Sequence, residues 1–483
     1  MSSATRGLLP FLISLVFYII IGPILLILCL LNELVRLLIR CYLWKKYEGE
    51  IDLVPDGADA LYALKRQERT RTVVVCLKTD KPVPHEKVKE NFKDVILQAR
   101  DSTGKLIYSK LTQILVTKLG YACWKRDENF DLKNHFRSLP SNKIYSKKEI
   151  QKEIKQMVQD MEEDKPQWEI ITVPRFVDSK GDPETSILIF RWQHAYMDGF
   201  TFTAMFVNHM SSGFTYYIHP TKFQIPFEKK MLSYLNAIIF GPYAFILITL
   251  NKFKSFWPRQ VSNESAKTQS TYTWTNSMEL EPIQKLRKEV DNATIPTILE
   301  NAFISAAKEI LPPGRVPEEI SIWELAALLP YPGDGPQSRF AFFTFNINSN
   351  QDDFERIQTS KKDSWDGITG PWIPLSFVLF KLSGRLPVFM HYVVFAGGSC
   401  SIMMSNLPLS KTRFRMLDTA DVLEVWAFPP QPNDTGITLF SAAYENSLKI
   451  AVSAKPTWLS EEELERIVEK MPGVLNEWVT RVD

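Results

Sequence analysis

The amino-acid sequence predicts an α/β protein of two lobes behind an N-terminal transmembrane helix. Three observations lead to this fold class. Residues Leu8 to Leu31 carry no charged side chain. Strand-type and helix-type apolar periodicities alternate along the rest of the chain. The 483 residues are enough for two domains or one large two-lobed unit, and 45% hydrophobic with 23% charged residues is a globular composition.

Charge and cysteine usage exclude several classes of function. The chain has 57 Lys and Arg against 55 Asp and Glu, and this net charge of +2 offers no surface for nucleic acid. The cysteines are scattered singly without a C-x-x-C spacing, which favours a reducing compartment over a disulfide framework or a zinc ribbon. They are Cys29, Cys41, Cys76, Cys123 and Cys400. No cluster of metal-ligating residues is apparent in the sequence, so we expect no metal.

The first segment is predicted to anchor the chain in a membrane. Leu8 to Leu31 is long enough to cross a hydrocarbon core at ~1.5 Å per residue. The basic residues after it outnumber Arg6 before it, which places the rest of the chain in the cytoplasm. These residues are Arg36, Arg40, Lys45 and Lys46. A soluble core helix is the alternative interpretation.

The next part of the chain alternates strands with helices. Ile51 to Leu64 is expected to be a loop with a short strand. Further strands are predicted at Arg71–Leu77, Leu115–Trp124, Glu169–Val173 and Ser186–Trp192. Helices are predicted at Glu86–Ala99 and Ser146–Met161, the second with a Ser cap and Glu149 three residues on. The turn residues Ser179–Asp182 join the last two strands into a hairpin.

A second uncharged segment, Met231 to Leu250, has lysines on both sides. A full span would put the two halves of the chain on opposite sides of the membrane, so they could not build one site. The Gly241–Pro242 break and the cationic flanks favour a helix that lies in, or dips into, one leaflet. A spanning helix and a buried core hairpin are the alternatives. The flanking residues are Lys229, Lys230, Lys252 and Lys254.

The last part of the chain predicts a second α/β lobe after a polar linker at Gln260–Ser270. Helices are expected at Ser277–Val290, Ile295–Leu311 and Ser460–Lys470. Strands are expected at Arg339–Ile347, Ser401–Met404, Val422–Phe428, Ile437–Ala443 and Leu448–Ser453. We therefore divide the chain into an anchor (1–47), a first lobe with the candidate site (48–225), a membrane-associated crossover and linker (226–270) and a second lobe (271–483).

The segment Ser186 to Asn208 carries the strongest functional signal. Its strand ends at Trp192, and His194, Asp198 and Gly199 follow before a helical pattern begins. An imidazole where a strand gives way to a helix is well placed for chemistry in an α/β protein. A hydrogen-bonded His–Asp pair without a chemical role is the plain alternative.

Several short motifs, in order, resemble the wax ester synthase / diacylglycerol acyltransferase family of the coenzyme-A-dependent acyltransferases and condensation domains. The family pattern H-H-x-x-x-D-G is matched with Gln193 in place of the first His. The other matches are Phe130, Asp131, His135, Arg137, Leu139 and Pro140 to F-D-x-x-x-H-x-R…L-P, Pro166–Glu169 to P-L-W-E, Ser405–Pro408 to S-N-V-P, and Ser441–Leu448 to the S-Y-x-G region. The Asn-Asp pair of the family is missing near Pro296 and Thr297.

This resemblance implies two chloramphenicol-acetyltransferase-like lobes with mixed sheets around a central tunnel. It implies transfer of a fatty acyl group from acyl-CoA to a long-chain alcohol or diacylglycerol, with acyl-CoA as co-substrate and no cofactor. The partners would be these lipids and a membrane. The endoplasmic reticulum is the expected location, with lipid droplet and plasma membrane as alternatives. Gln193 and the missing pair leave a second hypothesis open, a catalytically inactive lipid-binding or lipid-transfer protein of the same fold.

The resemblance also assigns roles to the site residues. His194 would be the general base, since an imidazole with a pKa of about 6.5 suits removal of a hydroxyl proton near neutral pH. Asp198 would be structural and pair with an arginine such as Arg191. Gly199 would let the backbone approach the tunnel where a Cβ would obstruct it. Asn406 would donate to the oxyanion, with a plain turn residue as the alternative.

Three further residues are predicted to bind substrate. Gln193 would orient the acceptor or only satisfy backbone groups, and Trp168 and Ser405 belong to matching motifs. His135 is expected to pack or to form a hydrogen bond. The chain has no G-x-S-x-G nucleophile motif.

Overall fold

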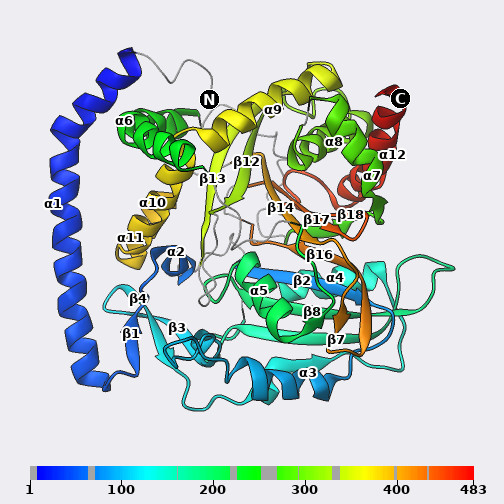
Figure 1. The fold of residues 1–483 in the computed structure, drawn as a ribbon, viewed down its shortest axis with the longest axis horizontal. Helices are drawn as coiled ribbons and strands as arrows, with labels where there is room; N and C mark the ends of the chain where they lie inside the picture. The colour runs from blue at the N-terminus through cyan, green and yellow to red at the C-terminus, as the bar shows by residue number, and fades with distance from the viewer. Residues whose placement is uncertain are drawn as a thin grey trace.

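The computed structural model confirms the two-lobed α/β class, with one large mixed sheet in each lobe (Figure 1). The structure describes residues 8–63, 71–159, 161–217, 226–251, 269–291, 293–328, 338–395, 400–431 and 435–482. The predicted linker at Gln260–Ser270 lies almost entirely outside them, as do Lys252 and Lys254.

The first lobe is built on an eight-stranded sheet with the order β5-β7-β8-β2-β16-β15-β9, and β6 also pairs with β7. The predicted hairpin is present, because β7 and β8 pair antiparallel with Trp168 opposite Trp192. The strands are β2 (Thr72–Thr79), β5 (Phe136–Ser138), β6 (Tyr145–Ser146), β7 (Trp168–Val177), β8 (Thr185–Gln193), β9 (Ser211–Ser212), β15 (Arg415–Met416) and β16 (Ala420–Phe428).

Two strands of this sheet come from the far end of the chain. We expected residues 271–483 to form their own lobe, but β15 and β16 lie in the first lobe. β16 pairs antiparallel with β2, with Val74 opposite Phe428. The apolar run of β2 is buried, as expected for a strand in the middle of a sheet. Its backbone N–H and C=O groups form hydrogen bonds with β8 on one side and β16 on the other. The lobes are therefore linked in two ways: by the chain connection, and by two strands from the end of the chain that belong to the sheet of the first lobe.

The second lobe is built on a seven-stranded sheet with the order β10-β18-β17-β14-β12-β13, and β11 also pairs with β18. β14 is longer than predicted and runs straight through Asn406. β12 was not predicted, although Glu319 and Ser321 alternate with Ile320 and Ile322 as in a half-buried strand. The strands are β10 (Thr271–Trp274), β11 (Met278–Glu279), β12 (Glu319–Ala327), β13 (Phe340–Asn348), β14 (Ile402–Ser410), β17 (Ile437–Tyr444) and β18 (Ser447–Ala454).

A small third sheet, ordered β1-β4-β3, lies beside the first lobe. Its strands are β1 (Ile51–Leu53), β3 (Gln113–Lys118) and β4 (Tyr121–Arg126). The single strand predicted at Leu115–Trp124 is wrong: it is a hairpin. The chain reverses at Leu119 and Gly120, whose φ angles of 48° and 82° lie in the left-handed region. Such a two-residue reversal suits the twist of antiparallel strands.

Most predicted helices are present. The cap of α4 is a full capping box, with Ser146 and Glu149 each binding the other's backbone N–H. The predicted helix Glu86–Ala99 is shorter, because α3 ends at Asn91 and the wider turn η3 follows. The helices of the lobes are α2 (Gly57–Ala60), η2 (Leu61–Ala63), α3 (His85–Asn91), η3 (Phe92–Ile96), η4 (Ser109–Thr112), η5 (Leu132–His135), α4 (Lys147–Met157), α5 (Gly199–His209), α7 (Leu280–Glu289), α8 (Ile295–Ile310), α9 (Asp353–Thr369) and α12 (Glu461–Val482).

Four apolar helices gather on one side of the molecule (Figure 1). They are α1 (Leu8–Tyr47), α6 (Phe227–Asn251), α10 (Trp372–Gly384) and α11 (Val388–Phe395). Among the described residues, α1 is the one helix long and apolar enough to cross a membrane. Only 6% of its most apolar 18-residue stretch is buried inside the protein.

The helix α6 runs unbroken through Gly241 and Pro242, so the predicted break there is wrong. Pro242 has no N–H for the carbonyl of Ile238, one turn earlier. The hydroxyl of Tyr18 on α1 donates to that carbonyl oxygen at 2.6 Å instead. The N–H of Tyr243 also donates to Ser14 Oγ at 3.3 Å. Contact with α1 thus satisfies the groups that the proline leaves exposed.

The second half of α1 docks on the globular part of the protein. Arg36 is 6% exposed. Its guanidinium donates to the carbonyl oxygens of Val54 and Arg385, each at 3.2 Å. Glu33 pairs with Arg385, and Arg40 pairs with Asp52. The end of α1 is therefore fixed to both the first lobe and the loop after α10.

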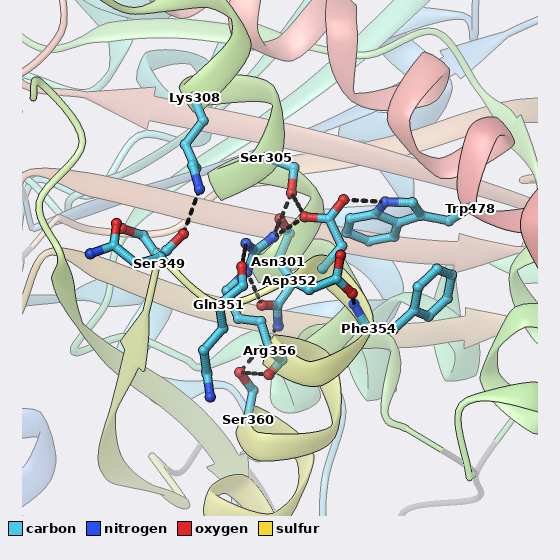
Figure 2. A network of polar contacts seen from close by, with 12 residues as sticks. Asn301, Ser305, Lys308, Ser349, Gln351, Asp352, Phe354, Arg356, Ser360 and Trp478 are labelled. Carbon is cyan, nitrogen blue, oxygen red and sulfur yellow. Dashed lines mark hydrogen bonds and ion pairs between the residues drawn. The ribbon is translucent and has the colours of Figure 1, made fainter. Parts of the chain in front are cut away.

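A buried arginine holds three helices of the second lobe together (Figure 2). Arg356 on α9 is 1% exposed, and its Nε donates to Asn301 Oδ1 of α8 at 2.8 Å. It also pairs with Asp353 at 2.8 Å, and Asp353 accepts a hydrogen bond from Trp478 Nε1 of α12 at 2.9 Å. Ser305 of α8 donates to the same carboxylate at 2.7 Å. The charge is paired and hydrogen-bonded, which is what a buried guanidinium requires.

Candidate active site

His194 lies directly after β8, at the junction of the two lobes. Its backbone N–H donates to the carbonyl oxygen of Arg71 at 2.9 Å, which continues the pairing of β8 with β2. The half-buried imidazole stacks on the ring of Tyr62, with centroids 4.5 Å apart. The ring of Phe340, the first residue of β13, meets it edge-on at 5.5 Å. The imidazole is therefore enclosed by one ring from the first lobe and one ring from the second lobe.

Gln193 holds the residue that stacks on His194. Its Nε2 donates to the carbonyl oxygen of Tyr62 at 2.9 Å, and its Oε1 accepts from the N–H of Ala195 at 2.8 Å. Arg71 also donates to the Tyr62 carbonyl, at 3.1 Å. The Gln193 side chain is 1% exposed. These contacts favour its interpretation as a partner of backbone groups over direct contact with an acceptor.

Asp198 begins α5 and joins the two lobes. Its Oδ1 accepts from the N–H of Thr201 at 2.8 Å, as an N-cap does. Its Oδ2 accepts from the backbone N–H of Arg339 at 3.0 Å, just before β13. The predicted partner Arg191 instead pairs with Glu169 at 2.6 Å, its neighbour across β7 and β8. Asp198 thus fixes the loop that carries His194 to the strand that carries Phe340.

Gly199 is exposed at the first position of α5. A Cβ at this position would meet no protein atom within 4 Å. The expectation that a Cβ here would obstruct the approach to the tunnel therefore stays a prediction. Open space surrounds the start of this helix, one residue beyond Asp198.

Asn406 lies inside β14, so its interpretation as a turn residue is wrong. Its Oδ1 accepts from the hydroxyl of Ser441, its partner on β17, at 2.7 Å. Among the residues that the structure describes, the two N–H groups of the amide have no hydrogen-bond acceptor in the protein. An amide held by its oxygen in this way is suited to donate to a ligand.

The second sheet divides at the predicted S-N-L-P motif. β12 and β14 pair in parallel only as far as Glu324 and Met404. Beyond that point β12 pairs with β13, and β14 pairs with β17 and, at its last residue Ser410, with Tyr216. Ser405 and Asn406 are partly exposed as a result, whereas the residues before them are buried.

Trp168 and His135 lie in the core of the first lobe. Trp168 is 4% exposed, its Nε1 donates to the carbonyl oxygen of Leu111 at 2.8 Å, and its ring stacks on His135 at 4.3 Å. His135 Nδ1 is 2.8 Å from the carbonyl oxygen of Trp168. Burial lowers the pKa of His135, which favours its neutral form. These contacts explain both residues by packing, as we expected for His135 but not for Trp168.

A buried ion pair supports the loop after His194. Asp59 on α2 is 1% exposed and pairs with Lys110, whose ammonium also donates to the carbonyl oxygen of Ala195 at 3.4 Å. Burial raises the pKa of Asp59 to about 6, and Lys110 opposes that rise. No sequence motif marks Asp59, Lys110, Tyr62 or Phe340, because each reaches the site by tertiary contact alone. The described residues contain no group of His, Cys, Asp and Glu side chains that could hold a metal ion.

Comparison with known proteins agrees with this geometry. Residues 59–288 match the family model described as the wax ester synthase/diacylglycerol acyltransferase catalytic domain. The predicted family resemblance is confirmed. The match to this acyltransferase family covers Tyr62, Gln193, His194, Asp198 and Gly199, whereas Asn406 lies beyond it. A search of curated protein sequences gave no match.

Several solved structures share the fold of this chain over most of its length. The wax ester synthase/diacylglycerol acyltransferase from Marinobacter aquaeolei VT8 is 13% identical with a TM-score of 0.53, covering 89% of this chain and 98% of that one. Trichothecene 15-O-acetyltransferase from Fusarium sporotrichioides is 10% identical, with a TM-score of 0.54 and coverages of 88% and 95%. The first condensation domain of the CDA synthetase is 11% identical, with a TM-score of 0.57 and the same coverages.

Proposed function

We propose that the protein is a membrane-bound O-acyltransferase that transfers a fatty acyl group from acyl-CoA to a long-chain alcohol or diacylglycerol. The observation that carries this proposal is the position of His194. A half-buried imidazole lies at the junction of the lobes, between Tyr62 and Phe340, and within a segment that matches the catalytic domain of the family.

The reaction needs one proton to move twice. His194 takes the hydroxyl proton as the acceptor oxygen attacks the thioester carbonyl carbon. The C–S bond then breaks, and His194 returns the proton to the coenzyme A thiolate. Ester and free coenzyme A are the products, so no covalent enzyme intermediate is required.

Two other residues support this step. Asn406 offers amide donors to the negative charge that develops on the carbonyl oxygen. Asp198 positions the base by fixing its loop to the second lobe. Gln193 takes part indirectly, because it holds the backbone of Tyr62.

The membrane part of the proposal rests on the apolar helices. α1 anchors the chain, and the basic residues after Leu31 place the lobes in the cytoplasm, where acyl-CoA occurs; the endoplasmic reticulum is the proposed location. Protease added to sealed microsomes is expected to digest the lobes. Protection of peptides that contain His194 would overturn this orientation.

The activity is tested with the full-length protein in detergent, labelled palmitoyl-CoA and a panel of alcohols and diacylglycerols, followed by separation of the lipid products. We expect labelled ester from at least one acceptor. If the wild-type protein forms no ester but binds these lipids, the chain is a lipid-binding protein of the same fold, and the enzymatic proposal fails.

A further inference from the structure

The helices α6, α10 and α11 lie beside α1 (Figure 1). They expose many large apolar side chains, and we call these three helices the apolar layer. A soluble protein rarely exposes so much apolar surface in one place. The exposed residues of this layer are Phe227, Met231, Leu232, Tyr234, Leu235, Ile238, Ile239, Phe245, Val378, Leu382, Phe389 and Met390. α6 packs on α1, the helix that is apolar enough to cross a membrane, so this exposed apolar surface is suited to contact with a lipid bilayer.

A row of aromatic rings connects this layer with the candidate base. Phe380 on α10 is 5.4 Å from Phe340 and 5.1 Å from Phe342 on β13. Phe340 is in turn 5.5 Å from the imidazole of His194. All four side chains are partly exposed rather than buried, although they lie between packed elements. The imidazole is thus two ring contacts away from the helix that faces the bilayer.

The same helix is locked to the segment that carries Tyr62. A Cβ on Gly384 of α10 would lie 1.7 Å from the carbonyl oxygen of Gly57, at the start of α2. Only glycine permits this approach of two backbones. Lys381 also pairs with Asp56 at 3.1 Å. Through α2 and β13, α10 is therefore fixed relative to both rings that enclose His194.

Resting on the proposed function, we infer that the lipid acceptor reaches His194 sideways from the bilayer, past α10, with its hydrocarbon chain against Phe380 and Phe340. The row from Phe380 to Phe340 contains no charged side chain, so it suits an uncharged lipid that carries one hydroxyl. That hydroxyl reaches the imidazole at the end of the row. Acyl-CoA, with its highly charged nucleotide, does not suit this route.

Photo-cross-linking tests the route in the full-length protein. The probe is hexadecanol with a diazirine and an alkyne in its chain, dissolved in phosphatidylcholine vesicles that hold the protein. We expect adducts on peptides with Phe340, Phe342 and Phe380, and excess plain hexadecanol should suppress them. Adducts confined to the outer face of α1, or insensitive to competition, would overturn the inference.

A pair of matched variants tests whether the route past α10 affects selectivity for chain length. Phe380→Trp should narrow the route, whereas Phe389→Trp makes the same change at a residue that is 69% exposed. The readout is the ratio of kcat/KM for hexadecanol to that for hexanol, which reaches the site from water. We expect a fall of about tenfold for Phe380→Trp, the usual scale for a small steric change in an apolar pocket, and an unchanged ratio for Phe389→Trp.

The two proposals fail in different ways. If wild-type protein forms no ester with any acceptor, the proposed function is wrong. If it forms ester but the Phe380→Trp ratio is unchanged, only the bilayer route is wrong. Should Phe380→Trp fail to fold, Phe380→Leu gives the second measurement. We expect it to change the chain-length ratio, and wild-type selectivity in Phe380→Leu would contradict the route.

Discussion

Two polar groups of the protein, Arg356 and His194, lie in opposite kinds of surroundings. Arg356 is 1% exposed and bound by neighbouring groups of α8 and α9 (Figure 2). His194 is half-buried between two aromatic rings at the lobe junction, beside the open space at Gly199. A fully paired buried charge holds elements together, whereas a partly accessible imidazole can still meet a substrate. The contrast predicts that Arg356 governs stability and His194 governs chemistry.

The largest effect is expected at His194. His194→Ala should lower ester formation by roughly 10²–10⁴-fold, the usual range for a lost general base. The melting temperature of this variant should fall only slightly, because the imidazole is only half-buried. Turnover and thermal unfolding are measured on the same preparation. Ester synthesis at the wild-type level would remove His194 from the mechanism.

The next effect is expected at Asn406. Asn406→Asp keeps the shape and the contact with Ser441 but removes the amide donors, so kcat should fall by about 10²-fold. Ser441→Ala is the control: it frees the amide without removing its N–H groups and should cost less. If both variants lose the same activity, positioning of β14 and not an oxyanion contact explains the loss.

Replacement of Arg356 should lower the stability of the protein and leave its turnover unchanged. Arg356→Leu leaves Asp353 and Asn301 without their partner and should destabilise the fold by about 3 kcal/mol. The remaining folded protein should keep its turnover. Lys361→Ala on the same helix α9 removes only a surface pair with Asp291 and should change stability by less than ~0.5 kcal/mol. Equal stability of the two variants in urea unfolding would contradict the structural role.

The smallest effect concerns a buried pair of carboxyl groups, Glu300 on α8 and Glu324 on β12. Burial raises the pKa of Glu324 to about 7, and burial with the neighbouring Glu324 raises the pKa of Glu300 well above its usual value. The folded state therefore holds more protons than the unfolded state above a pH of ~4.3. The stability these groups provide is complete below that pH and is lost as the pH rises through about 7.

Glu324→Gln should remove part of this loss of stability at high pH. We expect its melting temperature to exceed that of the wild type by a few degrees at pH 8, with the difference shrinking toward pH 5. The measurement is thermal unfolding of both proteins across this range. Parallel curves would show that Glu324 does not titrate with folding.

The sequence by itself determined the features that depend on neighbouring residues. The capping box of Ser146 and Glu149, the β7–β8 hairpin and the position of His194 between a strand and a helix are local, and all three are present. The family motifs were also readable, because each lies within a few residues. Local patterns misled at Gly241–Pro242, where contact with α1 keeps α6 continuous.

Only the tertiary structure decided what surrounds the imidazole. Tyr62 and Phe340 lie far from His194 in the chain and carry no pattern that marks them. The exchange of β16 into the first sheet and the division of the second sheet at Asn406 depend on pairing between distant strands. Periodicity reports which face of an element is buried but not what buries it. The partners of a site are therefore fixed by long-range packing, and a sequence read alone cannot assign them.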